Sequence, residues 1–134
     1  MLLKNKEHLN ILITGASRGI GKKLLDHYSE EGQEVLGIST KNCNLASWEE
    51  TSLYFKQKRV EGLDIVIHCA AVNVTKFFHK MDYKTFRHMV DTNIMGTFNL
   101  LKCVIPRLKT HGSIIIFPLL LLLAREWVNL PTPD

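Results

Sequence analysis

The sequence contains too few cysteines to hold a small extracellular domain together. It has three, Cys43, Cys69 and Cys103. The number is odd, and no spacing among them resembles a disulfide framework or a metal site. Such thiols are typical of reducing compartments, where disulfides rarely persist. We therefore expect a cytoplasmic protein without a bound metal.

A long hydrophobic run is also missing. A membrane-spanning helix needs about 20 consecutive apolar residues. The most apolar stretch, Ile114–Ala124, has 11 residues and contains Pro118. The N-terminal stretch, Met1–Glu7, carries charge within its first few residues and has no apolar core of signal-peptide length. These features predict no association with a membrane.

The positive charge of the chain is modest and spread out. The 17 basic and 13 acidic residues give a net charge of +4. A nucleic-acid-binding protein usually gathers its basic residues on one face with aromatic residues between them. Here they are scattered, at Lys22–Lys23, Lys56–Arg59 and Arg107–Lys109 among other places. We expect no nucleic-acid partner, although a mildly basic surface suits an anionic cofactor.

Short apolar runs alternate with helical patterns along these 134 residues, which are enough for one domain. The runs predicted to form strands are Leu9–Ile13, Glu34–Ser39, Asp64–Cys69 and Ser113–Phe117. The segments predicted to form helices run from Ile20 to Gly32, from Ser47 to Arg59 and from Asp82 toward Pro106, with His111–Gly112 ending the last. This alternation predicts an α/β fold with a parallel sheet.

Three of these helix ends carry recognisable caps. Gly32 lies where a C-terminal cap belongs. Ser47–Glu50 forms a capping box, in which the Ser47 hydroxyl caps the helix and Glu50 reaches back. Asp82 can cap the third helix.

Ligands of such sheets bind at the carboxyl ends of the strands, beside the point where the strand order reverses. Three segments of this chain follow predicted strands and should share that edge. They are the loop containing Gly15, Gly19 and Gly21, the stretch Ser39–Asn44 and the stretch Cys69–Ala71.

The three glycines stand between a predicted strand and a predicted helix. Glycine lets the backbone turn tightly, and the start of the helix offers free N–H groups to a pyrophosphate. The alternative is a glycine turn that only packs the helix on the sheet. A triphosphate-binding loop is rejected, because the spacing from Gly15 to Gly21 is one residue too long and Lys23 stands where that motif has Ser or Thr.

The stretch Thr14–Gly21 matches the T-G-x-x-x-G-x-G loop of the short-chain dehydrogenase/reductase family. Asp64–Ala71 resembles the family's apolar strand that ends in N-N-A-G. Asp91–Phe98 is similar to its mid-helix segment, and Gly112–Phe117 to the strand that leads to its catalytic Ser. The resemblance implies the N-terminal half of a Rossmann-type doubly wound sheet, reaching about the fifth strand of that fold.

This resemblance implies roles for twelve residues of the site. The adenosine and diphosphate of the cofactor would be held by Gly15, Ser17, Arg18, Gly19, Ile20 and Gly21. Asn44 and Leu45 would flank the adenine, with the Asn44 side-chain carbonyl accepting from its amino group. Ala70 and Ala71, beside Cys69, would lie under the nicotinamide ribose. Asn93 would help to anchor the proton relay of the active site.

Several positions depart from the family pattern. His68 and Cys69 replace the two Asn residues, and Ala71 replaces the Gly. We expect His68 to be a strand-end histidine paired with backbone and Cys69 to be a small core residue. The family places a helix and a strand where this chain has only Ser39–Asn44, so this stretch is either a loop or a very short remnant of the third strand.

The end of the second predicted strand indicates the cofactor preference. An NAD-dependent enzyme places a carboxylate there to bind the ribose 2′-hydroxyl. This chain has Ser39, Thr40 and Lys41 instead, with Arg18 in the glycine loop. Hydroxyls and cations suit a 2′-phosphate, so the sequence predicts NADP(H) rather than NAD(H). In the alternative, Arg18 and Lys41 are solvated surface charges.

The family's catalytic Ser, Tyr and Lys are expected after Phe117, where the chain reads Pro118–Leu123. It has no Tyr after Tyr83 and no Lys after Lys109. We therefore expect two parts, an NAD(P)(H)-binding unit over 1–117 and a divergent apolar tail over 118–134. Three functions stay open: a catalytically incomplete oxidoreductase whose full-length parent acts on a carbonyl or alcohol, a non-catalytic nucleotide-binding module, and a truncated product without function. The pattern leaves oligomerisation open.

A shifted reading frame is our preferred account of the last segment. Repeated CTT codons for the Leu run read as TCT, a Ser codon, one frame away. The junction of Trp127 and Val128 then reads as Gly, and that of Pro131 and Thr132 includes Tyr among its options. The alternative is a genuine divergent tail. The nucleotide sequence of the gene around the Leu run would decide between them.

Overall fold

The structure confirms the predicted α/β class with a parallel sheet. The computed structural model describes residues 7–74 and 76–117. Their strands are β1 (Asn10–Thr14), β2 (Glu34–Ile38), β3 (Leu63–His68) and β4 (Leu108–Ile116), in the order β2-β1-β3-β4. Every pair of neighbours is parallel, so the chain must cross over the sheet between strands, and its helices make those crossings.

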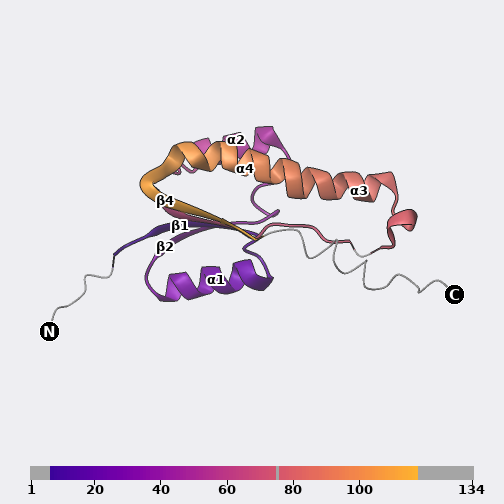
Figure 1. The fold of residues 1–134 in the computed structure, drawn as a ribbon. Coiled ribbons are helices and arrows are strands. Elements are labelled where there is room, and N and C mark those ends of the chain that lie inside the picture. The colour runs from indigo at the N-terminus through magenta and orange to yellow at the C-terminus, as the bar shows by residue number, and fades with distance from the viewer. Residues whose placement is uncertain (1–6, 75, 118–134) are drawn as a thin grey trace.

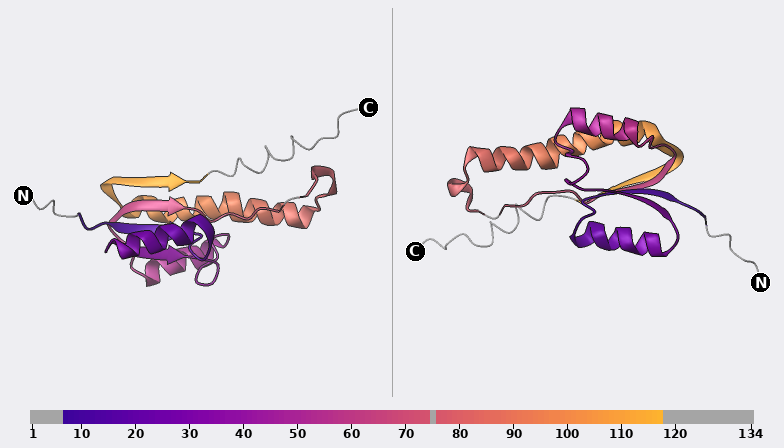
Figure 2. Two further views of the ribbon diagram at one scale, coloured as in Figure 1. Left: turned by 90° about the horizontal axis from the view of Figure 1, so that it is seen from below. Right: turned by 180° about the vertical axis from the view of Figure 1, so that it is seen from behind.

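Helices cover both faces of the sheet (Figure 1). One face carries α1 (Gly19–Glu30), and the other carries α2 (Trp48–Gln57) and α4 (Gly96–Val104). Helix α3 (Tyr83–Val90) continues into α4 through one π-helical turn, Asp91–Met95. Figure 2 shows that α3 extends past the carboxyl ends of the strands. Two short 3-10 turns, Phe78–Lys80 and Ile105–Arg107, complete the described elements.

The two helical layers create two cores, and the alternation of side chains along β1 divides them. Ile11 and Ile13 face α1 and join Ile67 in one cluster. Leu12 faces the opposite way and packs in the larger cluster, whose other members include Phe55 and Leu100. Because successive side chains of a strand point to opposite faces, an inner strand of a two-sided sheet must be apolar at every position.

The strand order reverses beside β1. The chain passes from β1 to β2 on one side and then crosses to β3 on the other side. The carboxyl ends of β1 and β3 therefore lie next to each other, with Thr14 in register with His68. In open α/β sheets a ligand crevice lies at this position.

The prediction for the last strand was wrong at its start. We expected His111–Gly112 to end a helix and Ser113 to begin a strand, whereas β4 begins at Leu108, in register with Leu63. An irregularity in the register between Leu63 and Ile65 accommodates the residues around Gly112. Pro106 has no N–H to donate and lies at the beginning of a 3-10 turn, where none is required.

The stretch Ser39–Asn44 forms a loop, which was one of the two alternatives. No strand occurs between β2 and α2. Instead Asn42 holds a tight turn, since its Oδ1 accepts from the N–H of Ser39 at 2.8 Å and its Nδ2 donates to the carbonyl of Gly37 at 3.1 Å. The expected tail, 118–134, and the shifted-frame hypothesis for it lie outside the described residues.

The predicted caps at Gly32 and Asp82 are confirmed, and the predicted capping box at Ser47–Glu50 is confirmed for Ser47 alone. The Asp82 side chain accepts from the N–H of Thr85 at 2.7 Å, and Gly32 has a φ of 78° after α1. The Ser47 hydroxyl accepts from the N–H of Glu50 at 3.2 Å. However, the Glu50 carboxylate accepts from the N–H of Asn44, at 3.0 Å, and not from Ser47. The helices within residues 7–74 and 76–117 include none with the length and apolarity to cross a membrane.

Candidate functional site

The glycine loop presses the start of α1 against the end of β3. Gly15 has a φ of 68°, and a Cβ added to it would lie 2.8 Å from the backbone nitrogen of Ala70. A Cβ on Gly21 would lie 2.2 Å from the Gly15 carbonyl oxygen. Real side chains are not accommodated at such distances, so both positions require glycine.

The beginning of α1 is open to a ligand. Arg18 occupies the N-cap and its side chain makes no capping hydrogen bond to the helix. The first turn contains no acidic residue. The N–H groups of an α-helix's first turn have no partner within the helix and carry a partial positive charge. Together these features leave free N–H donors and a partial positive charge at the start of α1.

The loop after β2 forms the second wall. Besides the Asn42 contacts, the N–H of Cys43 donates to the carbonyl of Ser39 at 3.0 Å, and the Lys41 N–H lies 3.4 Å from the Ser39 hydroxyl. Farther along, the Leu45 carbonyl accepts from Asn99 Nδ2 of α4 at 2.8 Å. The Asn44 Oδ1 accepts from the N–H of Ala46 at 3.1 Å. A carbonyl oxygen has two lone pairs, so one stays available for a ligand.

The segment Cys69–Val72 forms the floor of the site, and both of its ends are hydrogen-bonded. The Ala70 N–H donates to the Thr14 hydroxyl at 3.2 Å. Asn93 contacts Val72 twice: its Oδ1 accepts from the Val72 N–H at 2.8 Å, and its Nδ2 donates to the Val72 carbonyl at 2.9 Å. These bonds occupy the Asn93 side chain, which lies in the π-helical turn and supports the floor from behind.

These segments enclose a cavity of about 770 Å³ at the carboxyl ends of β1, β2 and β3. All of the predicted site residues line it except Lys41 and Asn93. Seven further residues line the cavity and were not predicted, namely Ile38, Cys43, Ala46, Val72, His88, Thr92 and Phe117. His88 and Thr92 are four residues apart on one helix, so helical spacing could have indicated that they share a face.

The cysteines of the cavity wall carry neutral thiols. Burial raises the pKa of both Cys43 and Cys69 above the ordinary value for a thiol. A raised pKa reduces the thiolate fraction, which is the reactive form. Residues 7–74 and 76–117 also contain no cluster of His, Cys, Asp and Glu side chains able to hold a metal. These two thiols are therefore suited to contact rather than to nucleophilic attack.

His68 is buried behind the floor, and its predicted backbone pairing was wrong. The ring contacts two hydroxyls instead, with Nδ1 2.6 Å from Thr14 Oγ1 and Nε2 2.8 Å from Thr97 Oγ1. Burial lowers the pKa of His68 to about 4. The imidazole is therefore neutral near pH 7. The side chains of β1 and α4 come close enough to bind it only in the folded chain, which is why a local reading of the strand end missed them.

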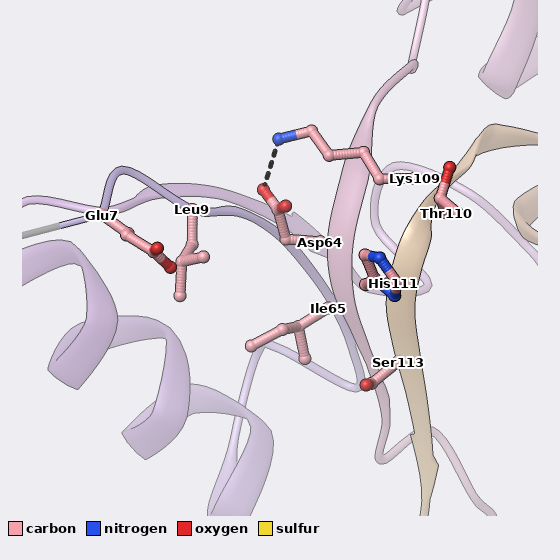
Figure 3. Close-up of a pocket in the computed structure, with 8 residues that line it drawn as sticks. All are labelled: Glu7, Leu9, Asp64, Ile65, Lys109, Thr110, His111 and Ser113. Atoms are coloured by element: carbon pink, nitrogen blue, oxygen red, sulfur yellow. Dashed lines mark hydrogen bonds and ion pairs between the residues drawn. The ribbon is translucent and has the colours of Figure 1, made fainter.

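A second cavity, of about 700 Å³, opens at the other end of the sheet, beside the amino ends of β1, β3 and β4 (Figure 3). It is lined by Glu7, Leu9, Asp64, Ile65, Lys109, Thr110, His111 and Ser113. The Asp64 carboxylate accepts from the N–H of Asn10 at 2.8 Å and lies 2.9 Å from Lys109 Nζ. The hydrogen bond from Asn10 and then the one from Lys109 lower the Asp64 pKa. Since ligands of such sheets bind at the carboxyl ends of the strands, the first cavity is the candidate site.

The family model described as short chain dehydrogenase matches residues 38–117. The chain belongs to the short-chain dehydrogenase family. The match includes the loop after β2, the floor and the whole of α3 and α4.

Curated short-chain dehydrogenases share the sequence at moderate identity. The 3-oxoacyl-(acyl-carrier-protein) reductase FabG of Vibrio cholerae is 27% identical over 133 residues, which cover 83% of this chain and 54% of that protein. The acetoacetyl-CoA reductase of Paracoccus denitrificans is 27% identical over 108 residues, covering 66% and 45%. The chain thus spans about half the length of the curated relatives it matches.

Solved structures of short-chain dehydrogenases have the same fold. A small-chain dehydrogenase in complex with NADPH superposes with a TM-score of 0.74 at 20% identity, covering 82% of this chain and 50% of that one. A short-chain dehydrogenase from Streptomyces avermitilis gives 0.74 at 16% identity, covering 82% and 49%. At these identities the likeness establishes the Rossmann-type fold alone.

Proposed function

We propose that this chain is the dinucleotide-binding half of a short-chain oxidoreductase and that it binds NADP(H) in preference to NAD(H). The observation that carries the proposal is the cavity at the reversal of strand order, where the uncapped start of α1 and the two crowded glycines, Gly15 and Gly21, meet. A pyrophosphate would accept from the first-turn N–H groups of α1. The cavity volume lies in the usual range for cofactor sites, roughly 300–1,000 Å³.

The adenosine end would lie against the loop after β2. Leu45 and Cys43 would supply apolar contact. The free lone pair of the Asn44 side-chain carbonyl would accept from the adenine amino group. At the other end, Ala70, Ala71 and Val72 would lie under the nicotinamide ribose. Asn93 would act there by holding Val72 in place.

The preference for the 2′-phosphate is supported by what lines the cavity near β2. Arg18, Ser39 and Thr40 line it, and Lys41 lies one residue farther along. Among the described lining residues there is no Asp or Glu whose charge would repel an added phosphate. An Arg–phosphate hydrogen bond is charge-assisted and contributes about 1.5–3 kcal/mol.

Calorimetric titration of the chain with NADPH and NADH tests this preference. Arg18→Ala should weaken NADPH binding by about tenfold and leave NADH binding within about twofold, because only NADPH carries the 2′-phosphate. Lys23→Ala is the matched control: it removes one charge from the exposed surface of α1 and does not line the cavity. Equal affinity of the unchanged chain for the two cofactors would contradict the preference.

The parent protein would transfer hydride between nicotinamide and a carbonyl or alcohol. The nicotinamide cofactor supplies the hydride chemistry when bound. The relatives named as reductases of 3-oxoacyl and acetoacetyl thioesters support a carbonyl substrate for the longer protein. This chain would contribute binding and orientation, since its described residues form the cavity for the cofactor. A non-catalytic binding module is the second candidate, favoured by the same observation.

A further inference from the structure

A string of hydrogen bonds runs through the buried region behind the floor. It begins at the Ala70 N–H, passes through the Thr14 hydroxyl to His68 Nδ1, and leaves His68 Nε2 for the Thr97 hydroxyl. Thr97 Oγ1 in turn lies 2.6 Å from the carbonyl oxygen of Asn93. The string therefore joins β1, β3 and the helix that carries Asn93.

The direction of every bond in this string follows from its last member. The backbone carbonyl of Asn93 can only accept, so the single hydroxyl proton of Thr97 is donated to it. Thr97 Oγ1 can then only accept from His68, which requires a proton on Nε2. The neutral ring consequently has a lone pair on Nδ1, and the Thr14 hydroxyl must donate to it. The Thr14 oxygen remains free to accept from the Ala70 N–H.

The opposite tautomer leaves a buried group without a partner. A proton on Nδ1 would put the lone pair of Nε2 against Thr97 Oγ1, whose proton is already donated to Asn93. A buried polar atom without a hydrogen bond costs about 1–3 kcal/mol. His68 is only 3% exposed, so water does not reach the ring readily. The Nε2–H tautomer is therefore the one that satisfies every member of the string.

The two ends of the string are the two supports of the floor. Ala70 is held by Thr14, which accepts from its N–H and donates to His68. Val72 is held by Asn93, whose own carbonyl accepts from Thr97. His68 does not line the cavity, but Ala70 and Val72 do.

We propose that His68, fixed as the Nε2–H tautomer between Thr14 and Thr97, is a positioning residue that couples the two supports of the cavity floor and so orders it for the cofactor. The part concerning the cofactor rests on the proposed function; the part concerning the floor does not. Burial keeps the pKa of His68 low, which is consistent with the neutral ring that the geometry requires.

The first test is ¹⁵N NMR of the His68 ring in the cofactor-free chain, assigned by comparison with His68→Asn. The expected spectrum has a pyrrole-type nitrogen at Nε2 and a pyridine-type nitrogen at Nδ1 at pH 7. A pyrrole-type Nδ1, or two protonated nitrogens at pH 7, would overturn the proposal. The decisive spectrum is that of the unchanged chain, and the variant serves only to identify which signals belong to His68.

The second test is Thr97→Val, which keeps the shape and removes the hydroxyl, with Thr97→Ser as the matched control that keeps it. Amide hydrogen exchange of Ala70 and Val72 should accelerate about tenfold in Thr97→Val, because the Nε2–H loses its acceptor, and should change less than twofold in Thr97→Ser. The Leu12 amide, inside β1, reports global opening. Equal acceleration of Leu12, Ala70 and Val72 would show a loss of overall stability only and would overturn the coupling.

NADPH titration of the same two variants completes the test. Thr97→Val should bind NADPH about three- to tenfold more weakly than Thr97→Ser. Equal binding by the two variants would overturn the role in ordering the site for the cofactor. If the unchanged chain binds no NADPH while its ring and amides behave as expected, the proposed function fails and the role of His68 in the floor stands.

Discussion

Gly21 lies so close to Gly15 that a Cβ on Gly21 would be 2.2 Å from the Gly15 carbonyl oxygen. The contact joins the third residue of α1 to the residue that follows β1, and backbone forms both sides of it. No rotation of a flexible side chain can relieve a clash of this kind. The glycine loop and α1 are consequently held at one separation.

Gly21→Ala should therefore disrupt the loop. Overpacking of a tight contact typically costs about 1–3 kcal/mol, and we expect a loss of this size in the free energy of unfolding measured in urea. NADPH affinity should fall more than tenfold, because the N–H groups of the first turn would move. Gly96→Ala is the control: its helical φ is −61° and the nearest atom to an added Cβ is 3.5 Å away. The idea fails if the two variants are equally stable.

The buried neutral His68 should make stability depend on pH. Its pKa is about 4 in the folded chain and 6.5 when unfolded, so the unfolded state binds more protons between these values. Stability is thus complete above about pH 6.5 and is lost as the pH falls toward 4. Between pH 7 and pH 5 we expect a loss of about 2 kcal/mol in the free energy of unfolding.

His68→Asn should remove this pH dependence, whatever its effect on stability at pH 7. Urea unfolding of both proteins at pH 7, 6 and 5 measures the two slopes. Hydrogen bonds from Thr85 lower the pKa of Asp82 to about 2 from its ordinary value of 3.8. The titration of Asp82 therefore changes stability only below about pH 3.8, outside the range of pH 5 to 7 of this experiment. Parallel slopes for the two proteins would contradict the assignment to His68.

The chain should not reduce carbonyl compounds by itself. General acid–base help is typically worth about 10²–10⁴ in rate, and the chain lacks a Tyr and a Lys after Phe117 to supply it. NADPH oxidation with a panel of ketones and acetoacetyl thioesters should stay at background. A substrate-dependent rate that Asn93→Ala abolishes would show that the site is complete without them.

The open side of β4 should promote association. In the described part of the chain β4 pairs only with β3, and Ile115 near its end is 47% exposed. An apolar strand with an unpaired edge invites pairing with another chain. Ile115→Lys should reduce light scattering at a given protein concentration. Leu53→Lys, which changes a 53% exposed residue of α2 in the same way, should have little effect. If both variants reduce light scattering equally, the added charge and not the edge of β4 explains the reduction.

The glycine loop and its surroundings could be predicted because they depend on backbone spacing. Gly15, Gly19 and Gly21 must follow a strand and precede a helix, and such order is local. The opposing segments could be placed because parallel strands present their carboxyl ends on one edge. Lys41 was the exception in this region: it lies in the turn that Asn42 holds and is not among the lining residues.

The support behind the floor could not be predicted in the same way. The partners of His68 are 54 and 29 residues away along the chain, so neither is visible to a local pattern. The π-helical turn that carries Asn93 has the same helical sequence periodicity as its neighbours. The start of β4 at Leu108 likewise depends on pairing with Leu63, which offsets the weak strand propensity of His111 and Gly112.

The parallel order of the sheet also determines when its strands can pair during synthesis. β1 leaves the ribosome first, and its pairing with β2 closes a short loop, Asn10 with Glu34. Its other edge must wait for β3, since Ile11 pairs with Ile65. At roughly 5–20 residues per second, that edge stays open for several seconds. Contacts so distant along the chain slow folding, so the edge of β1 that receives β3 is exposed for longer than the edge that receives β2.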